Sequence, residues 1–286
     1  MKILDGKLLA ERLNLELGQE ILSYTSKYKK NPHLAVVLVG NSPASQVYVK
    51  SKEKKAAEVG IKSTVIRLRN TISEKNLIKV IDKCNSDISI DSILVQLPLP
   101  NHINSDKVID RISIEKDVDG FNSKNIGLLA LGRPKVIPCT PLGCYKMLES
   151  ILDLEGKNVV VLGRSSIVGK PLSYLLTNRN ATVTLAHSKT RDLQGLCLNC
   201  DIIVAAIGKP NFVKKEWVKE NAVVIDVGIN VIGKKNGLRK IVGDVDYHDV
   251  KTKVSFISPV PGGVGPMTIH CLLSNTFSLT KSRNSL

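Results

Sequence analysis

The sequence has no long hydrophobic run and no signal-peptide pattern. Its continuous apolar stretches, such as residues 34–39 and 159–162, fall far short of the ~20 residues that a membrane-spanning helix needs. Residues 1–5 do not show the charged and apolar segments of a secretory leader. We therefore expect a cytoplasmic protein that has no membrane partner.

Aromatic residues are scarce, at 4% of the chain, whereas the net charge is +15. A nucleic-acid-binding protein usually gathers its basic side chains on one face and places aromatic rings among them for stacking. Here residues 1–143 hold 22 basic and 15 acidic residues and residues 144–286 hold 19 and 11, so the excess is +7 and +8. This even spread predicts no nucleic-acid partner, although positive charge would steer anionic small molecules toward the protein.

Metal-ligand patterns are lacking as well. The chain has six cysteines, but the C-x-x-C of Cys197 and Cys200 has no second pair at a matching distance, as a structural zinc site would need. In an intracellular chain of this length, cysteines are more often small buried apolar side chains. We therefore expect no metal site.

The alternation of apolar patterns predicts an α/β fold. With 286 residues and 43% hydrophobic residues, the chain is long enough for two domains. Short continuous apolar runs are typical of parallel strands that helices cover on both faces. Helices are predicted at residues 8–28, 43–59, 73–84, 140–152, 168–178 and 266–279, and strands at 34–39, 63–68, 92–96, 158–162, 182–186, 202–206 and 222–227. Thr140 is predicted as the N-cap of its helix, with a proline at the first helical position.

The second half contains a candidate dinucleotide-binding turn. The predicted strand at 158–162 leads into Gly163, Arg164 and Ser165, and Gly169 follows just before a helix. Backbone N–H groups in such a turn reach a pyrophosphate, and the helix N-terminus adds partial positive charge. Because the spacing is G-x-S-x-x-x-G rather than G-x-G-x-x-G, a plain strand-to-helix turn is the alternative.

The region after the next predicted strand favours NADP over NAD. An NAD site usually places an acidic residue there to hold the ribose hydroxyls, but residues 186–191 contain none. Arg164, Ser188, Lys189 and Arg191 instead offer groups for a 2′-phosphate. A solvated loop with no specific role is the alternative.

Polar residues in the first half form a second candidate site. Tyr48 and Lys52 lie one helical turn apart, and a partly desolvated lysine beside a tyrosine can transfer protons. An exposed amphipathic helix is the alternative. Gln96 ends a buried strand, where parallel sheets place ligands. Asp117 and Asp119 lie in a loop where they either bind a ligand or cap backbone N–H groups.

The segment 258–266 is dense in proline and glycine, which predicts a fixed backbone path, with a cis-proline turn as one option. Together with it, several segments resemble one family in order and spacing. That family is the bifunctional methylenetetrahydrofolate dehydrogenase/methenyltetrahydrofolate cyclohydrolase family. The segments are Tyr48-Val49 with Lys52, Gln96-Leu97-Pro98-Leu99-Pro100, Asp117-Val118-Asp119-Gly120-Phe121, Pro138-Cys139-Thr140-Pro141, Gly163-Arg164-Ser165 with Gly169, and residues 259–268.

The resemblance implies an N-terminal α/β folate-binding domain and a Rossmann-type dinucleotide-binding domain, separated by a cleft. The first would comprise residues 1–139, with a C-terminal helix at 266–286 packing back on it, and the second residues 140–265. It implies oxidation of 5,10-methylenetetrahydrofolate with NADP+, then hydrolysis of the methenyl product to 10-formyltetrahydrofolate. A homodimer with tetrahydrofolate derivatives as ligands is also implied.

The resemblance also implies roles for individual residues. Lys52 would be the central catalytic residue, Tyr48 would position the substrate, and Gln96 would tune Lys52 by hydrogen bonding. Asp119 would bind the pterin ring. Further folate contacts would come from Pro261, Gly262 and Gly263, and cofactor contacts from Gly163, Arg164, Ser165, Ser188, Ile229 and Thr268. The loop after Ser188 varies in the family, and Ser258 stands where threonine is common.

Overall fold

The computed structural model describes residues 1–235 and 238–284, which fold into two compact units. The six-stranded unit comprises Met1–Glu11 and Thr140–Thr268, and the three-stranded unit comprises Arg12–Cys139 and the described residues from Ile269 onward. The chain passes between them within three helices, α1 (Gly6–Tyr28), α6 (Cys139–Glu149) and α10 (Val264–Asn284). Residues 285 and 286 of the helix predicted at 266–286 lie outside the described residues.

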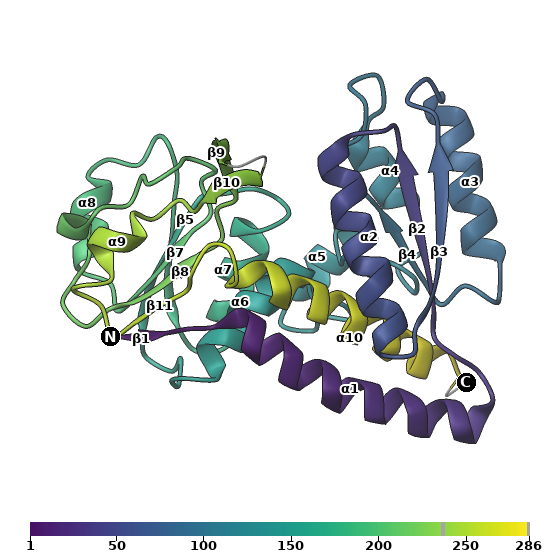
Figure 1. Ribbon diagram of the computed structural model, residues 1–286, viewed down its shortest axis with the longest axis horizontal. Helices are drawn as coiled ribbons and strands as arrows, with labels where there is room; N and C mark the ends of the chain where they lie inside the picture. The colour runs from purple at the N-terminus through teal and green to yellow at the C-terminus, as the bar shows by residue number, and fades with distance from the viewer. Residues whose placement is uncertain (236–237, 285–286) are drawn as a thin grey trace. The chain divides into compact units, whose positions relative to one another are not determined.

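The three-stranded unit contains a parallel sheet in the order β3-β2-β4. Its strands are β2 (His33–Val39), β3 (Lys62–Leu68) and β4 (Ser92–Val95), and its helices include α2 (Pro43–Glu58), α3 (Glu74–Ser86), α4 (Ser105–Arg111) and α5 (Ser123–Ala130). Every residue of β2 is buried. Ala35 and Val37 pack with Leu77 and Ile81 of α3, and α2 lies on the other side of the sheet (Figure 1). The continuous apolar run thus reflects a strand covered on both faces.

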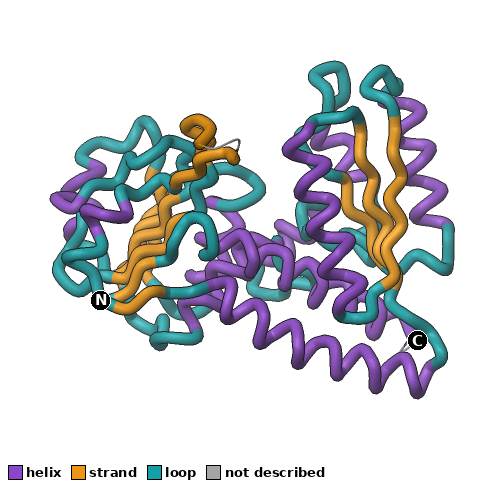
Figure 2. The backbone as a smooth tube through the Cα atoms, in the orientation of Figure 1, coloured by secondary structure: helices purple, strands orange, loops and turns teal. Residues whose placement is uncertain are grey.

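The six-stranded unit contains a second parallel sheet, in the order β1-β11-β8-β7-β5-β6 (Figure 2). Its strands are β1 (Lys2–Ile3), β5 (Asn158–Leu162), β6 (Thr182–Ala186), β7 (Ile202–Ala205), β8 (Val223–Asp226) and β11 (Phe256–Ile257). From β5 the chain moves to β6 on one side and then returns to β7 on the other. The strand order therefore reverses beside β5, where open α/β sheets bind ligands at the carboxyl ends of the strands.

Shorter elements complete this unit. They are α7 (Gly169–Thr177), α8 (Leu193–Leu198), the 3₁₀ turn η1 (Lys215–Trp217), α9 (Tyr247–Val250) and the antiparallel pair β9 (Asn230–Lys235) and β10 (Leu238–Val242). Because β1 pairs with β11, the first residues of the chain belong to this unit rather than to the three-stranded one.

The predicted α/β class with parallel sheets is confirmed, with one local correction. Helix α6 begins at Cys139, so Thr140 lies inside the helix and is not its N-cap. The Thr140 hydroxyl instead lies 3.1 Å from the hydroxyl of Thr268. The Val260–Pro261 bond is cis, as is Leu97–Pro98.

All six cysteines are buried and none is part of a disulfide, which confirms their interpretation as small buried side chains. Among the described residues, no helix is both long and apolar enough to cross a membrane.

Candidate active site

Lys52 is the centre of the site in the three-stranded unit. It lies on α2 in register with Ser45, Val49 and Ala56, which form the buried face of that helix. The Lys52 side chain is 5% exposed. Its Nζ donates to Oε1 of Gln96 at 3.2 Å and lies 4.5 Å from the centre of the Tyr48 ring. The alternative of an exposed amphipathic helix is therefore wrong for Lys52.

Gln96 is held so that its carbonyl oxygen faces this lysine. Its backbone N–H donates to the carbonyl of Val37 at 2.9 Å, which extends the sheet by one residue beyond β4. Its side-chain Nε2 donates to the carbonyl of Leu97 at 2.7 Å. With Nε2 engaged, Oε1 is the acceptor that remains for Lys52.

Burial and nearby charge shift the titration of this cluster. Burial lowers the pKa of Lys52, and the negative charge of Asp119 opposes that fall. Burial raises the pKa of Asp119, which the Lys52 ammonium opposes. The pKa of Tyr48 is raised by burial and by Asp119. A lysine that loses its proton more readily than usual is suited to general-base work.

The loop that carries Asp119 is fixed from two sides. The buried carboxylate of Asp117 accepts from the backbone N–H groups of Gly120 at 3.1 Å and Asn122 at 2.9 Å, and from Nδ2 of Asn125 at 2.8 Å. Burial raises the pKa of Asp117 to about 6, although these donors oppose the rise. Asp117 thus caps backbone groups, whereas Asp119 is close enough to Lys52 for each charge to shift the pKa of the other group.

On the other side of this loop, Asn275 of α10 donates to the carbonyls of Val118 and Ile137, both at 3.0 Å. The same amide lies 3.6 Å from Sγ of Cys139, and that thiol donates to the carbonyl of Val118 at 3.5 Å. Asn275 and Cys139 were not predicted as site residues. The only sequence signal for either was the position of Cys139 inside the Pro138–Pro141 motif.

The predicted dinucleotide turn lies where β5 ends and α7 begins. A Cβ at Gly163 would lie 2.1 Å from the carbonyl oxygen of Ala206, and one at Gly169 would lie 1.9 Å from the carbonyl oxygen of Gly163. The Ser165 hydroxyl accepts from the backbone N–H groups of Val168 and Gly169. These contacts leave room only for glycine, which gives the close backbone approach that a pyrophosphate needs.

A cavity of about 330 Å³ opens beside this turn. Four predicted cofactor residues line it, namely Gly163, Arg164, Ser165 and Ser188. Its other lining residues come from the ends of β5, β6 and β7 and the loops that follow, and they include His187, Ile207, Lys209 and Phe212. Lys189 and Arg191 are exposed in the loop after β6.

Two predicted cofactor residues lie elsewhere in the same unit. Ile229 is 64% exposed in the loop between β8 and β9. Thr268 lies on α10 and donates to the carbonyl of Val264 at 3.1 Å. The structure brings neither of them into the lining of the 330 Å³ cavity.

The predicted folate-contacting residues Pro261, Gly262 and Gly263 form the turn before α10 in the six-stranded unit. A Cβ at Gly263 would lie 2.6 Å from the carbonyl oxygen of Pro259, and Gly262 has a φ of +106°. The fixed backbone path predicted for this segment is confirmed.

Two family models match the chain. The catalytic domain of tetrahydrofolate dehydrogenase/cyclohydrolase matches residues 4–119, and its NAD(P)-binding domain matches residues 138–284. The chain belongs to the tetrahydrofolate dehydrogenase/cyclohydrolase family. Its similarity to the bifunctional protein FolD of Wolbachia sp. subsp. Drosophila simulans is 52% identity over 276 residues, or 96% of this chain and 93% of the relative.

Solved structures of the family resemble this chain over its whole length. The bifunctional FolD of Campylobacter jejuni has a TM-score of 0.94 at 47% identity, with 100% of each chain covered. The FolD of Trypanosoma brucei, complexed with NADP cofactor and an inhibitor, has a TM-score of 0.96 at 36% identity, with 100% of this chain and 99% of that chain covered.

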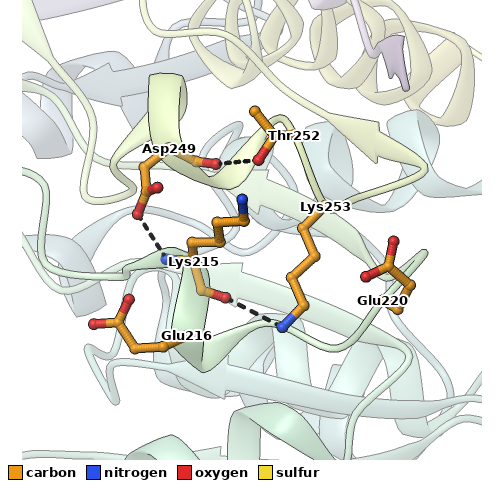
Figure 3. Close-up of a pocket in the computed structure, with 6 residues that line it drawn as sticks. All are labelled: Lys215, Glu216, Glu220, Asp249, Thr252 and Lys253. Carbon is orange, nitrogen blue, oxygen red and sulfur yellow. Dashed lines mark hydrogen bonds between the residues drawn. The ribbon is translucent and has the colours of Figure 1, made fainter.

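A separate pocket lies at the end of the six-stranded sheet opposite to the 330 Å³ cavity. Figure 3 shows the residues that line it, which are Lys215, Glu216, Glu220, Asp249, Thr252 and Lys253. These residues belong to η1 and α9 or lie just before β8 and β11, at the amino ends of those strands. The candidate cofactor site instead lies at the carboxyl ends of the strands. The carboxylate of Asp249 accepts from the backbone N–H of Lys215 at 3.1 Å. This pocket does not belong to the candidate site.

No group of three or more His, Cys, Asp or Glu side chains in the described part of the chain is arranged to hold a metal ion.

Proposed function

We propose that this enzyme runs its two reactions with a catalytic lysine in the three-stranded unit and a cofactor site in the six-stranded unit. It oxidises 5,10-methylenetetrahydrofolate to 5,10-methenyltetrahydrofolate by hydride transfer to NADP+, and it hydrolyses that product to 10-formyltetrahydrofolate. We assign folate binding to residues 1–139 with the helix at 266–286, and NADP binding to residues 140–265. The buried Lys52 beside Gln96 and Tyr48 is the observation that carries the assignment.

The turn at the end of β5 fits a dinucleotide, because Gly163 and Gly169 leave no space for side chains there. Gly163, Arg164, Ser165 and Ser188 would hold the cofactor beside the cavity, and Ile229 and Thr268 would add contacts. When bound, NADP+ supplies the carbon that accepts the hydride. The protein's part in that step is to hold the substrate bridge in the right orientation toward that carbon.

Lys52 would carry the hydrolysis. Water attacks the methenyl carbon, and neutral Lys52 takes the proton that the water oxygen loses. Lys52 then returns that proton to a ring nitrogen as the bond between that nitrogen and the one-carbon unit breaks. The hydroxyl of the adduct releases its own proton to solvent and becomes the formyl carbonyl. Gln96 would hold Nζ in place through its Oε1, and Tyr48 would position the substrate.

Asp119 would bind the pterin ring, since a carboxylate accepts hydrogen bonds from ring and amino N–H groups. Pro261, Gly262 and Gly263 would add contacts to the folate. The net charge of +15 suits the capture of an anionic tetrahydrofolate derivative.

The test is Lys52→Met, with separate assays of both reactions. We expect cyclohydrolase activity to fall by at least ~100-fold, the usual contribution of a positioned general base, while hydride transfer falls much less. The matched control is Lys54→Met, because Lys54 is exposed on the same helix, and it should keep both activities. Full cyclohydrolase activity in Lys52→Met would contradict the assignment.

We also propose a homodimer in the cytoplasm. Val231 and Ile232, which are 55% and 44% exposed, place apolar side chains on the surface of β9. A second copy of this chain would remove them from water. Sedimentation of the wild type should give a dimer and Val231→Lys should weaken it, whereas a monomeric wild type at micromolar concentration would contradict the proposal. Six cysteines outside any disulfide fit a reducing compartment.

A further inference from the structure

A buried carboxylate lies beneath the proposed cofactor edge and has no role in the reactions described above. Asp244 follows β10 and is 0% exposed. Its Oδ2 accepts from the backbone N–H groups of Ile207 at 2.6 Å and Gly208 at 2.9 Å. Its Oδ1 accepts from the backbone N–H of Lys209 at 3.0 Å and from Nδ2 of Asn230 at 2.8 Å.

These four donors come from the two loops that follow adjacent strands. Residues 207–209 follow β7, and both Ile207 and Lys209 line the 330 Å³ cavity. Asn230 begins β9, directly after Ile229. Asp244 does not itself line the cavity. One carboxylate therefore fixes the loop after β7, which lines the cavity, and joins it to Asn230 at the start of β9.

The backbone of Asp244 reinforces this attachment. Its carbonyl accepts from the N–H groups of Phe212 at 2.6 Å and Val213 at 2.9 Å. Phe212 also lines the cavity. The loop after β7 is thus tied to Asp244 along most of its length.

A second carboxylate holds Asp244 in turn. Asp226, at the end of β8, accepts from the backbone N–H groups of Asp244, Val245 and Gly228, each at 2.9 Å. Glycines make room for both groups. A Cβ at Gly243 would lie 1.8 Å from Oδ2 of Asp226, and a Cβ at Gly228 would lie 2.2 Å from Oδ1 of Asp244.

The charge of Asp244 is met by N–H groups rather than by a cation. In the residues that the structure covers, no Lys, Arg or His forms an ion pair with it. A buried charge with only dipolar partners needs each of its hydrogen bonds. The loops that supply those bonds are accordingly held in one geometry.

We propose that Asp244 is a positioning residue for NADP, whose carboxylate holds the loop 207–209 and Asn230 where the cofactor binds. The role rests on the proposed placement of NADP at this edge of the sheet. Asp244 belongs to the six-stranded unit and Lys52 to the three-stranded unit, so cofactor binding and cyclohydrolase activity should respond differently when Asp244 is changed.

Asp244→Asn tests this role while keeping the size of the side chain. Either orientation of the amide turns an NH₂ group toward two N–H donors, so two of the four hydrogen bonds are lost. We expect the Kd for NADP+, measured by titration calorimetry, to rise about 10- to 100-fold, as for the loss of hydrogen bonds to a buried charge. The KM for NADP+ should rise in parallel, kcat at saturating NADP+ should stay within about threefold, and cyclohydrolase activity should be unchanged.

Two further variants sharpen the experiment. Asn230→Ala removes one of the four bonds and should raise the Kd by a smaller factor than Asp244→Asn. Asp201→Asn is the matched control, because Asp201 accepts from the backbone N–H of Asn158 at the opposite end of the same sheet. It should leave the Kd for NADP+ at the wild-type value.

An unchanged Kd in Asp244→Asn, with a wild type that binds NADP+, would overturn the positioning role alone. An equal fall of cofactor binding and cyclohydrolase activity would overturn it too, because that is the result of a general loss of structure. A wild type that does not bind NADP+ would overturn the proposed cofactor placement itself.

Discussion

The candidate sites of the two units occupy similar positions in their sheets, but different chemical groups form them. Each site follows the carboxyl ends of parallel strands. In the three-stranded unit, the key groups are the ionisable side chains Lys52 and Asp119, whose pKa values burial shifts. In the six-stranded unit, a tight glycine turn and backbone loops form the cavity. Proton transfer needs shifted titratable groups, whereas binding a dinucleotide needs shape and N–H donors.

Both units use a buried aspartate to fix a loop. Asp117 in one and Asp244 in the other are buried carboxylates that accept backbone N–H groups from a ligand-facing loop. Neither aspartate is proposed to contact a ligand. A buried aspartate with several N–H donors converts a flexible loop into a fixed one, because leaving any of these donors unpaired costs free energy.

Gly169→Ala should give the largest difference between the effect on NADP+ binding and the effect on cyclohydrolase activity. Its Cβ would lie 1.9 Å from the carbonyl oxygen of Gly163, so the turn must move. We expect NADP+ binding to weaken by about 100-fold, which corresponds to the upper cost of overpacking a tight site, while cyclohydrolase activity remains. Gly127→Ala is the control, since nothing lies within 4 Å of a Cβ there. Loss of NADP+ binding and cyclohydrolase activity together would indicate a general loss of structure and would contradict this separation.

A smaller effect is expected in the three-stranded unit, where a substitution should change the pH dependence of cyclohydrolase activity and leave NADP+ binding unchanged. If neutral Lys52 is the base, cyclohydrolase kcat should rise with pH through the pKa of Lys52 and then level off. Asp119 holds that pKa up against the effect of burial. In Asp119→Asn, the rising limb should therefore move to lower pH, with NADP+ binding unaffected. A limb that stays in place or moves to higher pH would contradict this electrostatic coupling.

The sequence predicted the long helices and the buried strands because their apolar periodicity is strong and local. It did not reveal β1 or β11, each of two residues, because such short strands carry no periodic pattern and form only when distant segments pair. Helix α6 begins at Cys139 rather than at Pro141. Thr140 meets the sequence rule for an N-cap, but its hydroxyl bonds the distant Thr268 instead.

The site shows the same division. Lys52, Tyr48 and Gln96 were identified through motifs, and the structure brings them together. Asp244 was missed although it follows Gly243 directly, because its partners at 207–209 are more than 30 residues away along the chain. Because every residue except proline has a backbone N–H, the residues at 207–209 that donate to Asp244 need no particular side chain and show no sequence pattern. Only the fold identifies such an interaction.

The smallest effect concerns the choice between NADP and NAD in the six-stranded unit. Arg164 lines the cavity beside Ser188, and a guanidinium there would pair with a 2′-phosphate that NAD lacks. We expect Arg164→Ala to raise the KM for NADP+ by about tenfold, the value of one charge-assisted contact, and to change the KM for NAD+ much less. Arg191→Ala is the comparison, because Arg191 is an exposed cation of the loop after β6. A larger loss in Arg191→Ala would place the phosphate on that loop, and equal losses with both cofactors would mean that Arg164 acts on the pyrophosphate that they share.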